Sequence, residues 1–259
     1  MHTNLISQYL HFDSINSSYI YDSKNTSGNT SNCFKATFPM TQAFRKIKRV
    51  WLKSLEMPIN FPNIRTGSTN TLIFTMNGTK YTTSLSETNY TSISTLCTAI
   101  TTAVATTISG SGATMTFAVN SSKITITTTG VSSFSWTDTN LSKYILGFRT
   151  TDTFASNSIT GSCNYNLSPD NYINIYMPTF NAYNANQTGS WSSFKLPLNS
   201  VIGNVYYYQD ENSFTQSIDI RDDNLVMSQL QVIIYDRFGN NINPNGADWS
   251  FTLKIDYEL

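Results

Sequence analysis

The sequence predicts an all-β protein, an eight-stranded sandwich or jelly roll that is interrupted by a small α+β lobe. Three observations carry this prediction. Apolar and polar residues alternate in many short segments, as they do along strands that bury one face. Gly, Pro and Asn residues separate these segments at short intervals. Residues 93–108, by contrast, repeat their apolar positions every three or four residues, which is typical of a helix.

The composition suits strands and argues against nucleic-acid binding. The chain has 259 residues, of which 12% are charged, and its formal net charge is zero. Thr, Tyr, Val, Ile and Phe fit a pleated surface, whereas surfaces that bind nucleic acid are usually basic. We therefore expect no specific nucleic-acid partner. Low charge also weakens the repulsion between copies, so it favours close association.

The cysteines and the chain start indicate a cytosol-like place of synthesis. Cys33, Cys97 and Cys163 are odd in number, and their spacing resembles neither a metal site nor a disulfide framework. We expect them to be free thiols that pack as small apolar groups. Met1–Leu10 lacks the basic and apolar regions of a signal peptide. No apolar run approaches the roughly 20 residues that span a bilayer, so no membrane span is expected.

The first third of the body is the least regular part of the sequence. Residues 1–32 are polar and are expected to form an N-terminal arm, which either orders against a neighbouring subunit or frays. Residues 33–38 alternate like a short strand that Pro39 closes. Residues 44–57 mix a helical period with alternation, so the local pattern leaves both a helix and a strand open.

Residues 63–160 are predicted to form an inserted lobe with the order β-β-α-β-β. Asn77-Gly78 is a tight-turn signal between two strand segments. Residues 93–108 supply the amphipathic helix, and alternating segments return over residues 115–126. The lobe has the size of a usual domain and is placed between the second and third strands of the body. The jelly-roll domain is accordingly assigned to residues 33–62 and 161–259.

Six strand candidates follow the lobe, and with the two before it they make eight. The last is the clearest, because apolar residues occupy every second position from Trp249 to Ile255. The turn-rich stretch Asp236–Asp248 precedes it and indicates a hairpin with the strand before. The six candidates are 172–177, 194–198, 205–208, 214–220, 229–235 and 248–257.

The search for chemistry predicts no catalytic, cofactor-binding or metal-binding residues, and no enzyme. His2 and His11 both lie in the arm, which is a poor platform for a positioned imidazole or a metal ligand. An acidic cluster surrounds Arg221. Paired carboxylates can hydrolyse glycosides, but such a cluster is more often a solvated loop end. Its members are Asp219, Asp222 and Asp223.

Two other clusters are candidates for surface contacts. The basic run over residues 45–53 is either a patch that faces phosphate or acidic partners, or the wet face of a strand. The aromatic cluster is either a sugar-binding surface or a set of core and interface residues, and we favour the second interpretation. The basic residues are Arg45, Lys46, Lys48, Arg49 and Lys53, and the aromatic ones are Tyr183, Trp191, Tyr206, Tyr207 and Tyr208.

Three groups of motifs carry a family resemblance. They are Asp236–Asn240 with Asn245-Gly246 and Asp248–Leu253; His11–Ser14 with Leu55–Pro58; and Asn77-Gly78 with Asn89–Thr91 and Leu146–Phe148. In their order and spacing these motifs resemble the single jelly-roll penton (minor capsid) proteins of virophages, polinton-like viruses and related large DNA viruses. The likeness spans most of the chain. It departs from the family after Asp13-Ser14, where Ile15-Asn16 stands in place of the usual Arg.

The resemblance implies a jelly roll that stands upright in an icosahedral shell, with five copies at each vertex. It implies a strand at Ile47 and a lobe, residues 63–160, that forms a small outward head. The implied partners are other copies in a homopentamer, the double jelly-roll major capsid protein and other capsid proteins. A host receptor is a further candidate partner of the lobe. The implied location is the virion, with synthesis in the host cytoplasm or a viral factory.

Two other functions stay open. The alternative is a receptor- or glycan-binding β module of a viral spike or tail, which the aromatic, Thr-rich lobe favours. The third hypothesis is a hydrolase on a β sandwich, for which Asp219 and Asp223 are the candidate carboxylates.

Overall fold

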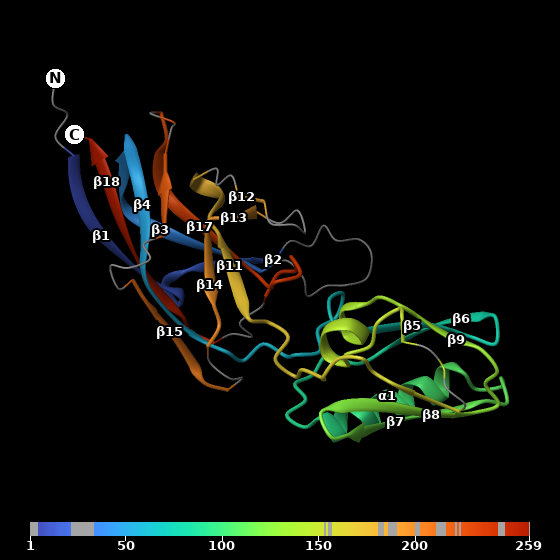
Figure 1. Cartoon of the computed structure of the whole chain (residues 1–259). Coiled ribbons are helices and arrows are strands. Elements are labelled where there is room, and N and C mark those ends of the chain that lie inside the picture. Colours follow the sequence, from blue (N-terminus) through green and yellow to red (C-terminus); the bar gives the residue numbers. More distant parts are fainter. Residues whose placement is uncertain are drawn as a thin grey trace. The chain divides into compact units, whose positions relative to one another are not determined.

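The computed structural model describes residues 5–21, 34–152, 154, 157–180, 184–185, 191–199, 203–210, 216–220, 222, 224–242 and 247–258. The chain divides into two compact units (Figure 1). The body consists of Met1–Phe61 and Asp170–Leu259, and the insert consists of Pro62–Pro169. The insert extends past residue 160, where the sequence analysis ended it. Backbone bonds hold the additional residues to it, for example from Gly161 N to Ile124 O at 3.0 Å.

The body contains two antiparallel sheets. The first has the order β1 (Leu5–Asp13), β18 (Ser250–Glu258), β4 (Ile47–Pro58) and β15 (Val205–Gln209), and β16 (Ser217–Asp219) also pairs with β4. The second has the order β14 (Phe194–Pro197), β11 (Tyr172–Tyr176), β17 (Val226–Tyr235), β3 (Phe34–Arg45) and β2 (Ser18–Tyr21). Short elements complete the body: η1 (Ser14–Asn16), η3 (Pro178–Phe180), β12 (Asn184–Ala185) and β13 (Trp191–Ser192).

The pairing is that of a single jelly roll, as predicted. The outermost pair in the chain is β1 with β18, followed inward by β3 with β17, β4 with β15 and β16, and β11 with β14. This nested order of strand pairs arises when a long antiparallel ribbon folds over on itself, so that its strand pairs are distributed over two sheets. β15 and β16 lie along the same edge of β4 and are counted as one strand position. With β2 regarded as an additional strand, the body then has eight strand positions.

The first strand lies in the segment that was expected to be an irregular arm. β1 pairs with β18 from Leu5–Glu258 to Asp13–Ser250. One face of this edge strand is exposed, and on the other only Phe12 is fully buried, stacked on Phe251 at 4.9 Å between ring centroids. The alternation of β1 is therefore weak in the sequence. Consequently the insert follows the third strand position, not the second.

The strand β4 explains why its sequence pattern was ambiguous. Its buried residues are spaced by three, two, three and two positions. The pairing with β18 shifts twice, which leaves Lys48 and Lys53 as extra residues on β4. A bulge adds one residue to a strand and interrupts the period of two, so the helical alternative is wrong. The buried residues are Ile47, Val50, Leu52, Leu55 and Met57.

Pro39 does not close β3, which continues to Arg45. The neighbouring strand β2 reaches only as far as Thr37, and the pairing with β17 is irregular between Met227 and Gln229, opposite Pro39. Proline is tolerated at strand edges and at bulges because no ladder hydrogen bond is lost there. Pro39 lies at both.

The predicted hairpin over Asp236–Asp248 is wrong, because β17 and β18 belong to different sheets. The connection crosses from one sheet to the other, and it is longer than the roughly two to five residues that are usual for hairpin loops. The buried carboxylate of Asp236 holds its first turn by accepting the backbone N–H groups of Phe238 and Asn240, each at 2.8 Å.

The body core matches the strongest sequence pattern. Trp249, Phe251, Leu253 and Ile255 are all buried. Phe38, from the opposite sheet, meets the ring of Trp249 edge-on at 5.5 Å. Burial of such apolar surface is the main stabilising contribution to a sandwich of this kind.

The insert contains a helix and two three-stranded sheets, β6-β5-β9 and β10-β8-β7. The apolar face of α1 (Ile93–Thr107) is buried as predicted. None of the helices in the described part of the chain has the length and hydrophobicity of a membrane-spanning segment. The other elements are β5 (Thr71–Met76), β6 (Thr79–Ser84), β7 (Thr114–Asn120), β8 (Lys123–Thr129), β9 (Phe134–Thr137), β10 (Ser158–Thr160) and the π-helical turn η2 (Leu141–Ile145).

Asn77-Gly78 forms the predicted tight turn between β5 and β6. Both residues have positive φ angles, 51° and 79°, as a two-residue hairpin turn requires. The side chain of Asn77 also accepts the N–H of Ser132 at 2.8 Å and donates to the carbonyl of Gly130 at 2.8 Å. The turn is therefore fastened to the loop that precedes β9.

Candidate interaction surfaces

The histidines and acidic residues do not come together as a catalytic or metal site. His11 is exposed on β1, where its Nδ1 lies 2.9 Å from the hydroxyl of Thr252. His2 lies outside the described residues. Within the described ranges, no group of three or more His, Cys, Asp or Glu side chains is placed to hold a metal ion.

The acidic cluster is a set of strand and turn contacts as far as it is described. Asp219 is largely exposed and forms an ion pair with Arg49, which joins β16 to β4. Asp222 accepts the backbone N–H of Asn224 at 2.9 Å, a turn contact. Arg221 and Asp223 lie outside the described residues. Neither described carboxylate has the buried surroundings that would prepare it for acid–base work.

Most of the basic run lies along β4 among carboxylates. Lys48 Nζ is 3.5 Å from Glu258, and Lys53 pairs with the buried carboxylate of Asp210. Lys46 has a φ of 48° in the tight connection between β3 and β4. With Arg49 paired as well, Lys48, Arg49 and Lys53 have acidic partners. This pattern fits the wet face of a strand better than a phosphate-binding patch.

The tyrosines of β15 alternate between core and solvent. Tyr206 is buried, and burial raises its pKa to about 12. Tyr208 packs partly against the core, and burial followed by the nearby charge of Asp210 raises its pKa as well. Tyr207, between them, is 66% exposed. The other members of the aromatic cluster, Tyr183 and the side chain of Trp191, lie outside the described residues.

The two described cysteines, Cys97 and Cys163, are free thiols. Cys97 is buried on α1, and this burial raises its pKa to about 11, so it is a poor nucleophile at neutral pH. Cys163 is half-buried. Cys33 lies outside the described residues.

The surface feature that sequence reasoning missed is the distribution of exposed apolar side chains. Seven large ones are exposed among the described residues, and all but Val119 belong to the body. Four of them lie on β1 and β15, the edge strands of the β1-β18-β4-β15 sheet, whereas Ile15 lies in η1 and Val226 on β17 of the other sheet. Leu5, Tyr9, Ile15 and Val226 lie on or near β1 and the end of β3, which we call the β1 flank; Val205 and Tyr207 lie on β15, which we call the β15 flank.

Strand edges are open on both flanks. In the described part of the chain, β1 pairs with β18 alone, β15 with β4 alone, and β3 beyond Thr37 with β17 alone. The edge of β14 is different, because the side chain of Gln216 occupies it. Lys195 N donates to Gln216 Oε1 at 2.8 Å, and Gln216 Nε2 donates to Lys195 O at 2.5 Å. Open edges are ready to pair with another chain.

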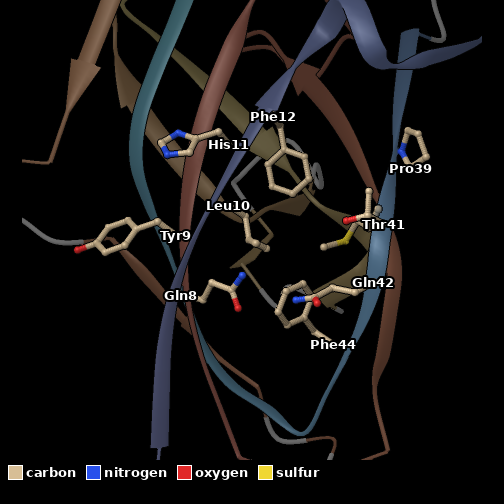
Figure 2. Close-up of a pocket in the computed structure, with 10 residues that line it drawn as sticks. Gln8, Tyr9, Leu10, His11, Phe12, Pro39, Thr41, Gln42 and Phe44 are labelled. Carbon is tan, nitrogen blue, oxygen red and sulfur yellow. The ribbon is translucent and has the colours of Figure 1, made fainter.

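A hollow of about 510 Å³ lies between β1 and β3 on the β1 flank. Figure 2 shows Leu10, Phe12 and Phe44 in the space between the two strands, whereas Tyr9 and His11 point to the other side of β1. Among the described residues that line it there is no Asp, Glu, Lys or Arg. These residues are Gln8, Tyr9, Leu10, His11, Phe12, Pro39, Met40, Thr41, Gln42 and Phe44.

Comparison with known proteins gives matches among solved structures. No protein-family model matches the chain, and no curated protein matches it. Thirteen solved chains match. One is the crystal structure of the selenomethionine-labelled mavirus penton protein, which is 14% identical, with a TM-score of 0.49, over 96% of this chain and 99% of that chain. The jelly-roll assignment above rests on the strand pairing of this chain itself.

Proposed function

We propose that this chain is a capsid vertex protein that forms a closed ring of five at the fivefold vertices of an icosahedral double-stranded DNA virus. The observation that carries the proposal is the pair of unlike flanks at opposite ends of one sheet. Each flank combines an open strand edge with exposed apolar side chains. The resemblance of the sequence motifs to penton proteins supports the same function.

Unlike flanks favour a cyclic assembly. A contact between two different surfaces repeats from copy to copy and closes into a ring when the rotation allows it. Neighbouring strands in this sheet are antiparallel throughout, so β15 runs opposite to β1. Rotation about an axis along the strands therefore brings β15 of one copy to β1 of the next in the antiparallel sense, the more stable ladder. The contact would also cover edges that otherwise invite aggregation.

The proposal includes partners and a location. We propose that the ring meets the double jelly-roll major capsid protein and other capsid proteins, and that the chain is made in the host cytoplasm or a viral factory and resides in the virion. A stable contact of standard size buries about 800 Å² on each partner. The exposed Tyr207 and Tyr9 are of a residue type that is enriched at the centres of such interfaces.

Electron microscopy of virus particles tests this function. A reconstruction of particles from wild-type infection is expected to show five copies of this chain at each fivefold vertex. Particles made without the gene are expected to lack this density, and expression of the chain in trans restores it. A reconstruction in which another protein fills the vertices would refute the proposal.

A second candidate function is glycan or receptor binding by the insert. One observation favours it: the outward residues of β7, β8 and β10 are mostly threonines. Hydroxyl pairs link the strands, at 2.6 Å between Thr114 and Thr129 and 3.0 Å between Thr125 and Thr160. Such a hydroxyl-bearing face, on which Lys123 at the start of β8 is a charged residue, is compatible with neutral sugars.

A glycan array probed with the full chain tests this second function. Binding that Thr127→Glu abolishes, and that Thr102→Glu on the exposed side of α1 leaves unchanged, would support a sugar site on this sheet. Silence across a broad array would count against it.

A further inference from the structure

The hollow between β1 and β3 leaves the partly buried side chains of Leu10 and Met40 accessible from one flank of the body. We propose that it receives the β15 strand of the neighbouring copy, with Tyr207 as the anchoring side chain. This inference rests on the proposed ring and adds to it the contacting residues on both sides.

The lining of the hollow favours an uncharged occupant with an aromatic side chain. Its inner part is apolar: Phe12 and Phe44 are buried, and Phe44 meets the ring of Tyr257 at 5.4 Å. Its outer part carries the exposed Thr41 and Gln42. A volume of about 510 Å³ is within the usual range of ligand sites, so a Tyr ring and an adjacent aliphatic side chain can enter together.

The β15 flank fits this description best. Leu5, Tyr9, Ile15 and Val226 belong to the same flank as the hollow, so in a head-to-tail ring they are not its occupant, and Tyr9 points to the other side of β1 (Figure 2). Among the described residues this leaves Val205 and Tyr207 as the large exposed apolar side chains of the body's other flank.

The two surfaces are also compatible in their charge. β15 reads Val-Tyr-Tyr-Tyr-Gln and has no Asp, Glu, Lys, Arg or His residue. The described residues that line the hollow likewise carry no carboxylate, ammonium or guanidinium group. Docking therefore does not bury a charge without a partner. An unpaired buried charge would destabilise the contact by roughly several kcal/mol.

Backbone groups add a second source of affinity. The hollow lies between two open edges, one on β1 and one on β3 beyond Thr37. The incoming β15 has an open edge of its own. A strand that pairs with an open edge gains main-chain hydrogen bonds, while its side chains in the pocket give specificity.

The first experiment measures assembly of the full chain by mass photometry over a concentration series. Tyr207→Ala is expected to weaken ring formation about 30-fold, the effect of losing an interface hot spot. Thr41→Arg, which places a cation at the mouth of the hollow, is expected to weaken it similarly. Tyr207→Phe keeps the aromatic ring of the side chain and should assemble like wild type. Thr102→Arg on α1 is the matched control. Melting temperatures verify that each variant folds.

Two further readouts identify the contact. The double variant Tyr207→Ala/Thr41→Arg should be less impaired than the two single effects combined, because both changes disrupt one contact. In a Cys33→Ser/Cys163→Ser background, copies with Thr41→Cys and copies with Val205→Cys should form a disulfide-linked dimer when mixed with an added mild oxidant, which takes up the two electrons. Each alone should not, because the contact joins unlike surfaces.

The outcomes separate this inference from the function on which it rests. If wild type forms rings and both Tyr207→Ala and Thr41→Arg do so equally well, the docking inference is wrong and the ring stands. If wild type forms rings but the mixed cysteine variants give no disulfide-linked dimer, the docking inference is likewise wrong and the ring stands. If another capsid protein fills the hollow, Thr41→Arg impairs incorporation into particles but leaves self-association intact, which also overturns the inference. If wild type does not assemble, alone or with the shell protein, the proposed function fails and the inference fails with it.

Discussion

The body and the insert are both antiparallel, yet they differ in how far apart along the chain their paired strands lie. In the body, β1 pairs with β18, so Phe12 lies opposite Phe251. In the insert, β5–β6 and β7–β8 are joined by two-residue connections. The insert is thus a local structure, whereas the body requires both ends of the chain. Distant pairing of this kind is slow to form because of its loop-closure entropy.

The two units also differ in what they expose. Six of the seven exposed large apolar side chains in the described residues lie in the body, and only Val119 lies in the insert. The insert presents threonines on the outer face of one sheet and along α1. If the chain forms the proposed ring, we therefore expect the body to supply the contacts between copies.

The largest expected effect is in the body core. Trp249→Ala should lower the free energy of unfolding of the body by about 3–5 kcal/mol, the usual cost of removing a buried aromatic side chain. Hydrogen exchange read by mass spectrometry should show faster exchange in β17 and β18, with α1 of the insert unchanged. An unchanged unfolding midpoint, or equal loss of protection in α1, would contradict the division into two units.

A matched pair of glycines tests the insert. Gly147 and Gly78 both have a φ of 79°, but a Cβ on Gly147 would lie 2.4 Å from the Cys163 carbonyl oxygen, whereas one on Gly78 would meet nothing within 4 Å. Gly147→Ala should therefore cost about 3 kcal/mol or more, and Gly78→Ala about 1 kcal/mol. Thiol labelling of Cys97 reports the opening of the insert. Equal effects of the two variants would show that the close approach at Gly147 is unimportant.

Alkaline pH should affect the two units over different ranges. Burial raises the pKa of Tyr206 in the body from 10.0 to about 12 and that of Cys97 in the insert from 9.0 to about 11. In each case the folded state holds the proton more tightly than the unfolded state. The resulting stability is complete below the lower value and is lost as the pH rises through the higher one.

Denaturant unfolding between pH 8 and pH 12 measures this loss. Tyr206→Phe should reduce the part of the alkaline loss that occurs in the body, to which Tyr208 also contributes, and leave that of the insert. If this variant follows the pH dependence of wild type, the burial of Tyr206 contributes nothing to it.

The smallest expected effect concerns the acidic cluster. Asp219→Asn removes the ion pair with Arg49, an exposed contact whose loss costs less than about 1 kcal/mol. Differential scanning calorimetry should show a nearly unchanged melting temperature, and assembly should be intact. A large loss of stability would mean that this pair is central to the attachment of β16 to β4.

The parts of the fold that depend on local pattern were predictable from the sequence. The alternation from Trp249 to Ile255, the buried face of α1 and the turn at Asn77-Gly78 were each confirmed. The jelly-roll class was also confirmed, because many short alternating segments with frequent turns allow few other architectures.

The errors arose where tertiary context overrides local pattern. The sequence pattern did not predict the strand β1, because β1 lies at a sheet edge and Phe12 is its one fully buried residue. β4 looked partly helical because two bulges shift its register. The link from β17 to β18 looked like a hairpin, although the strands it joins lie in different sheets. The hollow between β1 and β3 could not be foreseen, because it depends on which two strands become the open edges of the body.

Native mass spectrometry of the full chain over a range of concentrations tests the central claim most directly. If unlike flanks of the body meet in a closed ring, a single assembly of five times 29.0 kDa should build up without larger species. Persistence of the monomer at every concentration and in the presence of the shell protein, a dimer that grows no further, or an open-ended ladder of oligomers would each contradict it.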